Sequence, residues 1–160
     1  SFIDDLIDTM RSANGAGLAA IQVSRAIRIC VVEVRAPNPR YPYKPSIPLT
    51  IMINPEIMPV STETFSNYEG CLSVPDMRGL VERYAEVRLR YLDRGGQRQD
   101  AIIRGVCAGT FQHECDHLDG KLFVDLVEDS GSLTTWSNFE RYHQEKFFED
   151  AEKIVSKFGS

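Results

Sequence analysis

Two of the three histidines of this chain lie four residues apart, in the segment TFQHECDHLDG at residues 110–120. In an α-helix, residues i and i+4 share one face, so the rings of His113 and His117 can bind the same metal ion. Glu114 follows His113 directly and can reach a water molecule at the metal without binding the ion, as the general base of an H-E-x-x-H site does. The flanking residues VCAGTF are small or apolar, which favours a buried helix over a chance pair of surface histidines.

Two histidines leave room for a third protein ligand, and the sequence offers several. In one class of metalloprotease a third histidine lies six residues after the second, but that position is Phe123 here, which excludes the class. Another class takes a glutamate from a later helix, and the spacing leaves Glu140 and Glu145 open for this role. Cys71, in the segment YEGCLSVPDMRG (68–79), is a further candidate because a thiolate is a strong metal ligand. Most free cysteines, however, are small buried hydrophobic residues.

Three segments follow one another in the order of the signature motifs of the peptide deformylases: GAGLAAIQ (15–22), EGCLS (69–73) and QHECDH (112–117). The chain resembles this family from Gly15 to Val127, and the similarity includes the DRGGQ turn between the second and third motifs. The resemblance implies an enzyme that removes the formyl group from the N-terminal formylmethionine of newly made polypeptides and releases formate. It also implies that Cys71, His113 and His117 are the metal ligands.

The same resemblance implies a cofactor and catalytic groups. Fe(II) is usually the native ion of the family, and Zn(II) or Ni(II) also occupy the site, whereas a Cys-His-His-water ligand set by itself favours zinc. Glu114 is expected to take a proton from the attacking water and to return it to the leaving nitrogen. The side-chain amide of Gln22 and the backbone N–H of Leu72 are expected to stabilise the oxyanion.

Substrate-binding residues are expected around these catalytic groups. Gly15 and Gly17 allow a close approach to a peptide backbone, so we expect the substrate to lie along this segment like an added strand. Gly70 is expected to leave room beside the ion. A methionine side chain needs an apolar pocket, and the candidates share the helix face of His113: Val106, Gly109 and Thr110. Arg78 has two equally weighted interpretations, a contact with substrate carbonyls and a surface charge.

Composition and charge limit the other possibilities. The 160 residues, 42% of them hydrophobic and 26% charged, suit a single domain spanning 1–160. The formal net charge of −5 argues against DNA or RNA binding as the main function, and neither a membrane span nor a signal peptide is visible. Four scattered cysteines favour reduced thiols and hence a reducing compartment. We expect the bacterial cytoplasm, or the stroma or matrix of an organelle in a eukaryote.

The pattern of apolar residues predicts the elements that position the site. A helix is predicted over 2–13, strands over 27–34 and 49–57, and two further strands joined by DRGGQ within 81–105. Five prolines predict an irregular loop over 35–48. The histidine helix is predicted over 106–118, and a long helix with an aromatic stripe over 133–158. The fold class is therefore α+β, with short, mostly antiparallel strands around a central HExxH helix and with helices at both ends.

Some features depart from the family pattern. Ile21 stands where many members have proline, and its extra N–H bears on the tilt of Gln22. The chain begins at Ser1 rather than Met, and members usually carry a further segment before the first helix. In bacterial members the last helix can dock on the ribosome. Here it carries mixed charge, so we expect no more than a transient ribosome contact; the charged residues from Thr134 onward are Arg141, Lys146, Lys153, Lys157, Glu140, Glu145, Glu149, Asp150 and Glu152.

Two other function classes remain. The first is a zinc endopeptidase that takes a glutamate ligand from the last helix. The second is a non-catalytic relative that keeps the fold as a binding module, which fits less well because every residue that the chemistry needs is present.

Overall fold

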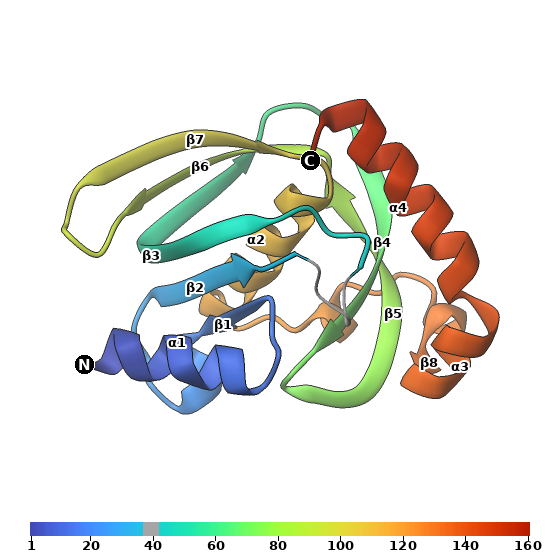
Figure 1. The fold of residues 1–160 in the computed structure, drawn as a ribbon, viewed down its shortest axis with the longest axis horizontal. Helices are drawn as coiled ribbons and strands as arrows, with labels where there is room; N and C mark the ends of the chain where they lie inside the picture. The colour runs from blue at the N-terminus through green and yellow to red at the C-terminus, as the bar shows by residue number, and fades with distance from the viewer. Residues whose placement is uncertain (37–41) are drawn as a thin grey trace.

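The computed structural model describes residues 1–36 and 42–160. Its centre is the helix α2 (Gly105–Leu118), which contacts strands of two antiparallel sheets. Figure 1 shows α2 between the larger sheet and the long β4–β5 hairpin, with the N-terminal and C-terminal helices on the outside. A helix enclosed in this way must be apolar or small on nearly all sides, and eleven of its residues are buried.

The larger sheet has the strand order β1-β2-β3-β6-β7, and every neighbouring pair is antiparallel. Its strands are β1 (Gly17–Ala19), β2 (Ile29–Val34), β3 (Ile47–Pro59), β6 (Glu86–Leu92) and β7 (Arg98–Arg104). The apolar side chains on one face of this sheet pack against α2. They form a core cluster that includes Cys30, Val32, Met52, Leu89 and Phe111.

The smaller sheet consists of β4 (Thr64–Cys71), β5 (Val74–Tyr84) and the two-residue β8 (Thr134–Thr135). β4 and β5 form a hairpin whose register places Gly70 opposite Arg78. Short 3-10 helices connect the elements: η1 (Ala20–Val23), η2 (Phe123–Asp125) and η3 (Ser130–Ser132). The hairpin turn follows Cys71, so this cysteine lies where β4 ends beside α2.

Helices cover the two sheets from outside. α1 (Phe2–Ser12) begins at a capping box formed by Ser1 and Asp4, and it buries Leu6, Ile7 and Met10. α3 (Trp136–Tyr142) and α4 (Gln144–Phe158) close the C-terminal side, where α4 packs on α2 and β4. No helix in residues 1–36 and 42–160 is long and apolar enough to cross a membrane.

The predicted α+β class and the elements around the site are confirmed, with three corrections. The single helix predicted over 133–158 is wrong, because the chain leaves helical geometry at His143 (φ −126°, ψ −24°) and forms α3 and α4. Segment 81–105 is divided between the sheets, since its first residues end β5 at Tyr84, and β6 and β7 flank the DRGGQ turn. Of the predicted loop, residues 42–46 have no helix or strand, 37–41 lie outside the described residues, and Ile47 already belongs to β3.

Candidate metal centre and catalytic pocket

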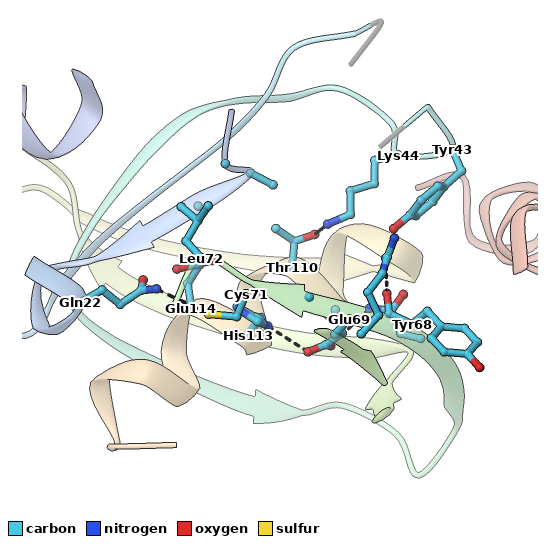
Figure 2. A pocket seen from close by; sticks show the side chains of 17 residues that line it. Gln22, Tyr43, Lys44, Tyr68, Glu69, Cys71, Leu72, Thr110, His113 and Glu114 are labelled. Carbon is cyan, nitrogen blue, oxygen red and sulfur yellow. Dashed lines mark hydrogen bonds and ion pairs between the residues drawn. The ribbon is translucent and has the colours of Figure 1, made fainter. Parts of the chain in front are cut away.

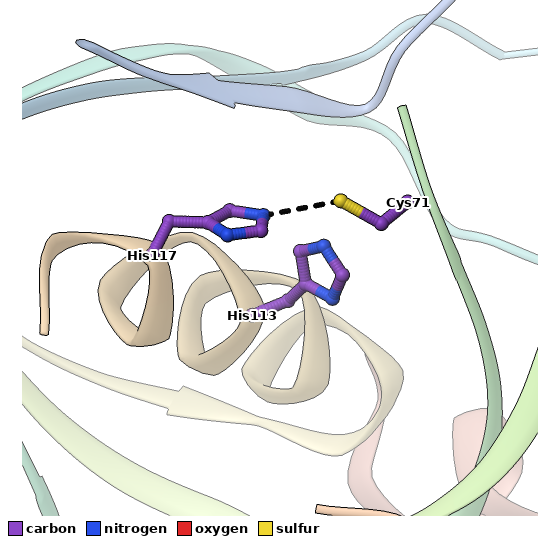
Figure 3. A group of neighbouring side chains, drawn as sticks. All are labelled: Cys71, His113 and His117. Carbon is purple, nitrogen blue, oxygen red and sulfur yellow. Dashed lines mark hydrogen bonds between the residues drawn. The ribbon is translucent and has the colours of Figure 1, made fainter. Parts of the chain in front are cut away.

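Three side chains from two elements meet beside α2. Cys71 ends β4, and His113 and His117 lie one helical turn apart on α2. The three possible ligand atoms lie within 4.8 Å of one another, and Sγ of Cys71 is 3.4 Å from Nε2 of His117. Figure 3 shows both rings turned toward the sulfur. Although burial opposes it, hydrogen bonds from His113 and His117 lower the pKa of the Cys71 thiol to about 5.

This donor set fits a divalent transition metal. One thiolate and two imidazoles are ligands of catalytic zinc and related ions, and they leave a position for water or substrate. A low thiol pKa favours the thiolate, which is the form that binds metals. Among the described residues, these three form the one group of His, Cys, Asp or Glu side chains that could hold such an ion. Glu140 and Glu145 are not part of it, so the geometry favours Cys71 over the alternative of a glutamate ligand from the last helix.

A buried ion pair fixes one of the two imidazoles. Oε2 of Glu69 lies 2.9 Å from Nδ1 of His113. The same carboxylate accepts two hydrogen bonds from Arg83, at 2.6 and 2.9 Å, and Arg83 also donates to Asp116 at 2.6 Å. Burial opposes ionisation of Glu69, but Arg83 and His113 outweigh it and hold its pKa well below the usual range. A carboxylate on Nδ1 leaves Nε2 of His113 free to bind a metal.

The carboxyl group of Glu114 lies inside the same pocket. Its Oε2 is buried and has no hydrogen-bond partner among the described residues. Burial raises the pKa of this carboxyl group, against the opposing effect of the two histidines. A Cβ atom at Gly17 would lie 2.4 Å from Cδ and Oε1 of Glu114, so only glycine leaves space for the carboxylate at this point of β1. The orphan oxygen therefore faces a site where a polar ligand can pair with it.

The side chain of Gln22 is oriented by the backbone. Its Oε1 accepts a hydrogen bond from the N–H of Ala19 at 2.9 Å, which turns Nε2 toward the second motif. Nε2 then donates to Oγ of Ser73 at 3.0 Å and approaches Sγ of Cys71 at 3.6 Å. The amide therefore faces the metal ligands, as the oxyanion role predicted from the motif requires, and Ile21 does not prevent this. Leu72, the other predicted donor, lines the same pocket.

One pocket contains most of the residues predicted from the sequence. Figure 2 shows their side chains converging from β1, η1, β4 and α2. The predicted residues that line it are Gly15, Gly17, Gln22, Gly70, Cys71, Leu72, Arg78, Gly109, Thr110, His113 and Glu114. Val106 does not line this pocket; it is buried and borders a separate hollow beside α4. Arg78 is 1% exposed, so the interpretation as a surface charge is wrong.

The structure shows which atoms lie close to each of the predicted glycines. A Cβ at Gly15 would lie 3.1 Å from Cδ1 of Leu72, and one at Gly109 would lie 3.2 Å from Cζ of Phe65. At Gly70 the nearest atoms to a Cβ are the Met77 carbonyl oxygen at 3.4 Å and Cγ of Arg78 at 3.7 Å. Because Gly70 has no side chain, the Arg78 side chain can lie across β4 at this position. That Gly70 also leaves space beside a metal ion stays a prediction.

Among the residues that sequence reasoning missed are three of the pocket, Glu69, Tyr43 and Lys44, and one residue that supports it, Arg83. Glu69 belongs to a quoted motif, and its place two residues before Cys71 was the one signal that could have revealed it. Arg83 comes from the far strand of the hairpin, where no motif marks it. Tyr43 and Lys44 come from the proline-rich loop, and Figure 2 shows both side chains over the pocket. Nζ of Lys44 donates to Oγ1 of Thr110 at 3.0 Å, which ties this loop to α2.

Comparisons with known proteins agree with this geometry. The family model described as polypeptide deformylase matches residues 1–132. The protein named peptide deformylase 2 from Nostoc sp. is 47% identical over 138 residues, which cover 86% of this chain and 76% of that protein. A peptide deformylase from Leptospira biflexa is 46% identical over 126 residues, covering 79% of this chain and 70% of the relative.

Solved structures give the same result. A class I type b peptide deformylase from Acinetobacter baumannii, in a Met-Ala-Ser complex, superposes with a TM-score of 0.73 at 44% identity and covers 79% of this chain and 82% of that one. A peptide deformylase from Synechococcus elongatus in complex with actinonin has a TM-score of 0.71 at 31% identity. That match covers 99% of this chain and 71% of the other, so the likeness extends over all the elements described above.

Proposed function

This chain belongs to the polypeptide deformylase family. From that premise we propose how the residues of its metal centre and pocket remove the N-formyl group from new polypeptides. The products are formate and a polypeptide with a free amino terminus. The observation that carries the proposal is the meeting of Cys71, His113 and His117 beside the buried, unpaired oxygen of Glu114. The chain therefore brings together side chains that can hold a metal and a carboxyl group that can transfer the proton in amide hydrolysis.

The substrate has a natural place along β1. This strand is at the edge of the larger sheet, so one side of its backbone is not paired with another strand of that sheet. An extended peptide can add to such an edge and pair its backbone with the strand. Gly15 and Gly17 line the pocket at this edge, which brings the first residue of the peptide to Glu114. The Acinetobacter baumannii relative has been solved with the tripeptide Met-Ala-Ser, which supports binding of a peptide N-terminus here.

Different residues of the chain would hold the metal, transfer the proton and stabilise the oxyanion. A divalent metal held by Cys71, His113 and His117 would supply a Lewis acid that makes water a stronger nucleophile at neutral pH. Glu114 takes the proton of the attacking water and delivers it to the amide nitrogen as the carbon–nitrogen bond breaks. The Gln22 amide and the Leu72 backbone N–H donate to the oxygen of the formyl group, where negative charge develops. Burial of Glu114 keeps competing water away from this proton transfer.

We propose Fe(II) as the resident ion, with Zn(II) or Ni(II) able to occupy the same ligands. Thiolate and imidazole ligands bind all three ions, and which ion occupies such a site depends on the metal supplied as well as on the donors. Metal analysis of protein purified without oxygen distinguishes them. The iron form should lose activity in air because a thiolate ligand at an open metal position is exposed to oxidation.

We propose one catalytic domain over 1–160, supported by the contacts of α2 with both sheets and with α4. The partner is the nascent formylated chain, in the bacterial cytoplasm or in an organelle stroma or matrix where such chains are made. Contact with the ribosome would be transient, because the surface of α4 carries paired charges of both signs, as in the Lys146–Asp150–Lys153 cluster.

The direct test is anaerobic incubation of the Fe(II)-loaded protein with a formyl-Met peptide. The proposal expects one formate and one new primary amine for each peptide consumed. Protein that contains iron at the site and releases no formate would overturn it. Unformylated casein serves as the second substrate, and its cleavage at internal bonds would indicate an endopeptidase instead.

A further inference from the structure

A short segment in front of β3 borders the catalytic pocket. We call this segment, residues 42–46, the strap; it contains no helix or strand and leads into β3 at Ile47. Its residues Tyr43 and Lys44 line the same pocket as Glu114. Figure 2 shows both side chains over the pocket, with Lys44 reaching toward α2. The strap therefore forms one side of the space that a substrate would enter.

The strap is attached to two helices. Nζ of Lys44 donates a hydrogen bond to Oγ1 of Thr110 on α2 at 3.0 Å. The ring of Tyr43 packs against two rings of α4, with centroid distances of 4.9 Å to Phe147 and 5.2 Å to Phe148. Aromatic pairs at such distances stabilise a contact beyond the area that they bury. Tyr43 thus anchors the strap on the C-terminal helix, and Lys44 anchors it on the helix that carries the histidines.

Thr110 places the second anchor beside the catalytic groups. It precedes Glu114 by one helical turn, so the two side chains share a face of α2, and Thr110 is 5% exposed. Its hydroxyl donates to the Val106 carbonyl oxygen at 3.5 Å, which leaves the oxygen as the acceptor for Lys44. A change at this hydroxyl would therefore act on the strap without replacing a metal ligand.

The lysine anchor costs folding free energy. Burial lowers the pKa of the Lys44 ammonium group to about 8, although the charges of Glu69 and Glu114 favour the cation. Lysine ammonium groups usually lie in water, with the methylene stem against apolar surface. A residue that destabilises the fold in this way is typical of a functional site, where stability and activity compete.

We propose that Lys44 is a positioning residue, whose hydrogen bond to Thr110 holds the strap against the side chain of the first residue of the substrate. The larger apolar and aromatic side chains of the pocket are Ala16, Tyr43, Tyr68 and Leu72. The strap contributes the Tyr43 ring and the methylene stem of Lys44 to this lining, so a methionine side chain is covered while the ammonium group stays hydrogen-bonded. The inference rests on the proposed function, because it adds a residue to the same site.

The test compares a first side chain that reaches the strap with one that is too short. The substrates are amide-capped formyl-Met-Ala-Ser and formyl-Ala-Ala-Ser, and the readout is the Met/Ala ratio of kcat/KM for metal-loaded protein. Thr110→Val, which removes the acceptor and keeps the size of the side chain, should lower this ratio by about tenfold, the contribution of one hydrogen bond to a charged group. The loss should appear mainly in KM. Thr110→Ser keeps the hydroxyl and should restore most of the ratio.

Lys44→Met removes the same contact from the strap and should also lower the Met/Ala ratio. Because both changes break one hydrogen bond, the variant that combines them should lose no more than Thr110→Val alone. Lys146→Met is the matched control, since Lys146 pairs with Asp150 on the exposed surface of α4 and the ratio should not change. Losses that multiply in the combined variant, or a wild-type ratio in folded Thr110→Val, would overturn the inference. If Thr110→Val does not fold, Lys44→Met decides.

Binding of the product peptides separates this inference from the proposed function. Calorimetric titration with Met-Ala-Ser and Ala-Ala-Ser measures Kd without turnover, and Thr110→Val should weaken binding of Met-Ala-Ser more than binding of Ala-Ala-Ser. If the wild type releases no formate, the proposed function fails, and the two Kd values still decide the role of Lys44. If the wild type releases formate while neither the rate ratio nor the Kd values depend on Thr110 and Lys44, the inference alone is wrong.

Discussion

The carboxylate of Glu69 holds the ring of His113 by its Nδ1 atom, at 2.9 Å, and so determines which ring nitrogen faces Cys71. Arg83 in turn fixes the carboxylate by two hydrogen bonds. Partners of this kind orient a metal-binding histidine and raise the basicity of its other nitrogen. The β4–β5 hairpin, through Glu69 and Arg83, therefore orients a metal-binding side chain of α2.

Replacement of this carboxylate should weaken the metal site. Glu69→Gln should lower metal affinity by about 10–100-fold, because the tautomer and orientation of His113 are no longer fixed. The variant should also unfold more easily, since it leaves the charge of Arg83 with Asp116 as its remaining partner. Competition with a chelator measures the first effect, and Glu82→Gln, an exposed position on β5, is the control. Equal metal affinity in both variants would contradict the role of Glu69.

The contact between Gly17 and Glu114 gives a second prediction. The Cβ of Gly17→Ala would lie 2.4 Å from the carboxylate carbon of Glu114, so the carboxyl group or β1 must move. Displacement of a catalytic group by about 1 Å can cost on the order of 10²-fold in rate. Gly15→Ala, whose Cβ would lie 3.1 Å from a flexible Leu72 methyl group, should have a smaller effect. Measurements of kcat/KM at equal metal content compare the two, and equal losses would refute the explanation.

Removal of the charge of Glu114 should separate catalysis from metal binding. Glu114→Gln should retain the metal, because the carboxylate is not among the three ligands, and should lose on the order of 10²–10⁴ in kcat. Glu140→Gln should change neither quantity, since Oε1 of Glu140 accepts a hydrogen bond from Trp136 at an exposed position on α3. A Glu114→Gln enzyme with wild-type turnover would remove Glu114 from the mechanism.

The stability of the protein should depend on pH through Lys44. Burial lowers the pKa of this ammonium group to about 8 in the folded protein, and an unfolded lysine titrates near ~10.4. Between these values the unfolded chain binds a proton that the folded chain does not, so Lys44 makes the free energy of unfolding rise with pH. Below about pH 8 both states are charged, and the cost of burying the ammonium group is fully present.

A comparison with Lys44→Met isolates this effect. The variant should be more stable than the wild type at about pH 7, and the difference should shrink between about pH 8 and about pH 10. Denaturant unfolding of both proteins at several pH values provides the measurement. A difference that stays constant over this range would show that Lys44 keeps its ordinary pKa in the folded state.

The local sequence predicted the central helix, the flanking strands and a metal site at His113 and His117. Histidines at i and i+4 share a helical face wherever the helix forms, and the three motifs identified Cys71 through the family. The break at His143 was missed because the apolar spacing continues across it, and apolar spacing alone does not specify a break. The division of segment 81–105 between β5 and β6 was missed, because sequence patterns do not reveal which sheet a strand joins.

The parts of the site that could not be predicted depend on contacts between distant segments. Arg83 and Glu69 are fourteen residues apart in sequence and pair across a hairpin whose register the sequence did not reveal. The environment of Arg78 depends on aromatic residues from α3, more than fifty residues later in the chain. Its burial becomes visible once those helices are in place.

The central claim is that the sulfur of Cys71 and the rings of His113 and His117 bind one metal ion, and cobalt substitution tests it most directly. A Co(II)–thiolate bond produces a charge-transfer absorption band in the near ultraviolet. We predict this band for the Co(II)-loaded wild type and for Cys107→Ser, which alters a buried cysteine elsewhere on α2, and its loss in Cys71→Ser. A band that persists unchanged in Cys71→Ser would contradict the account.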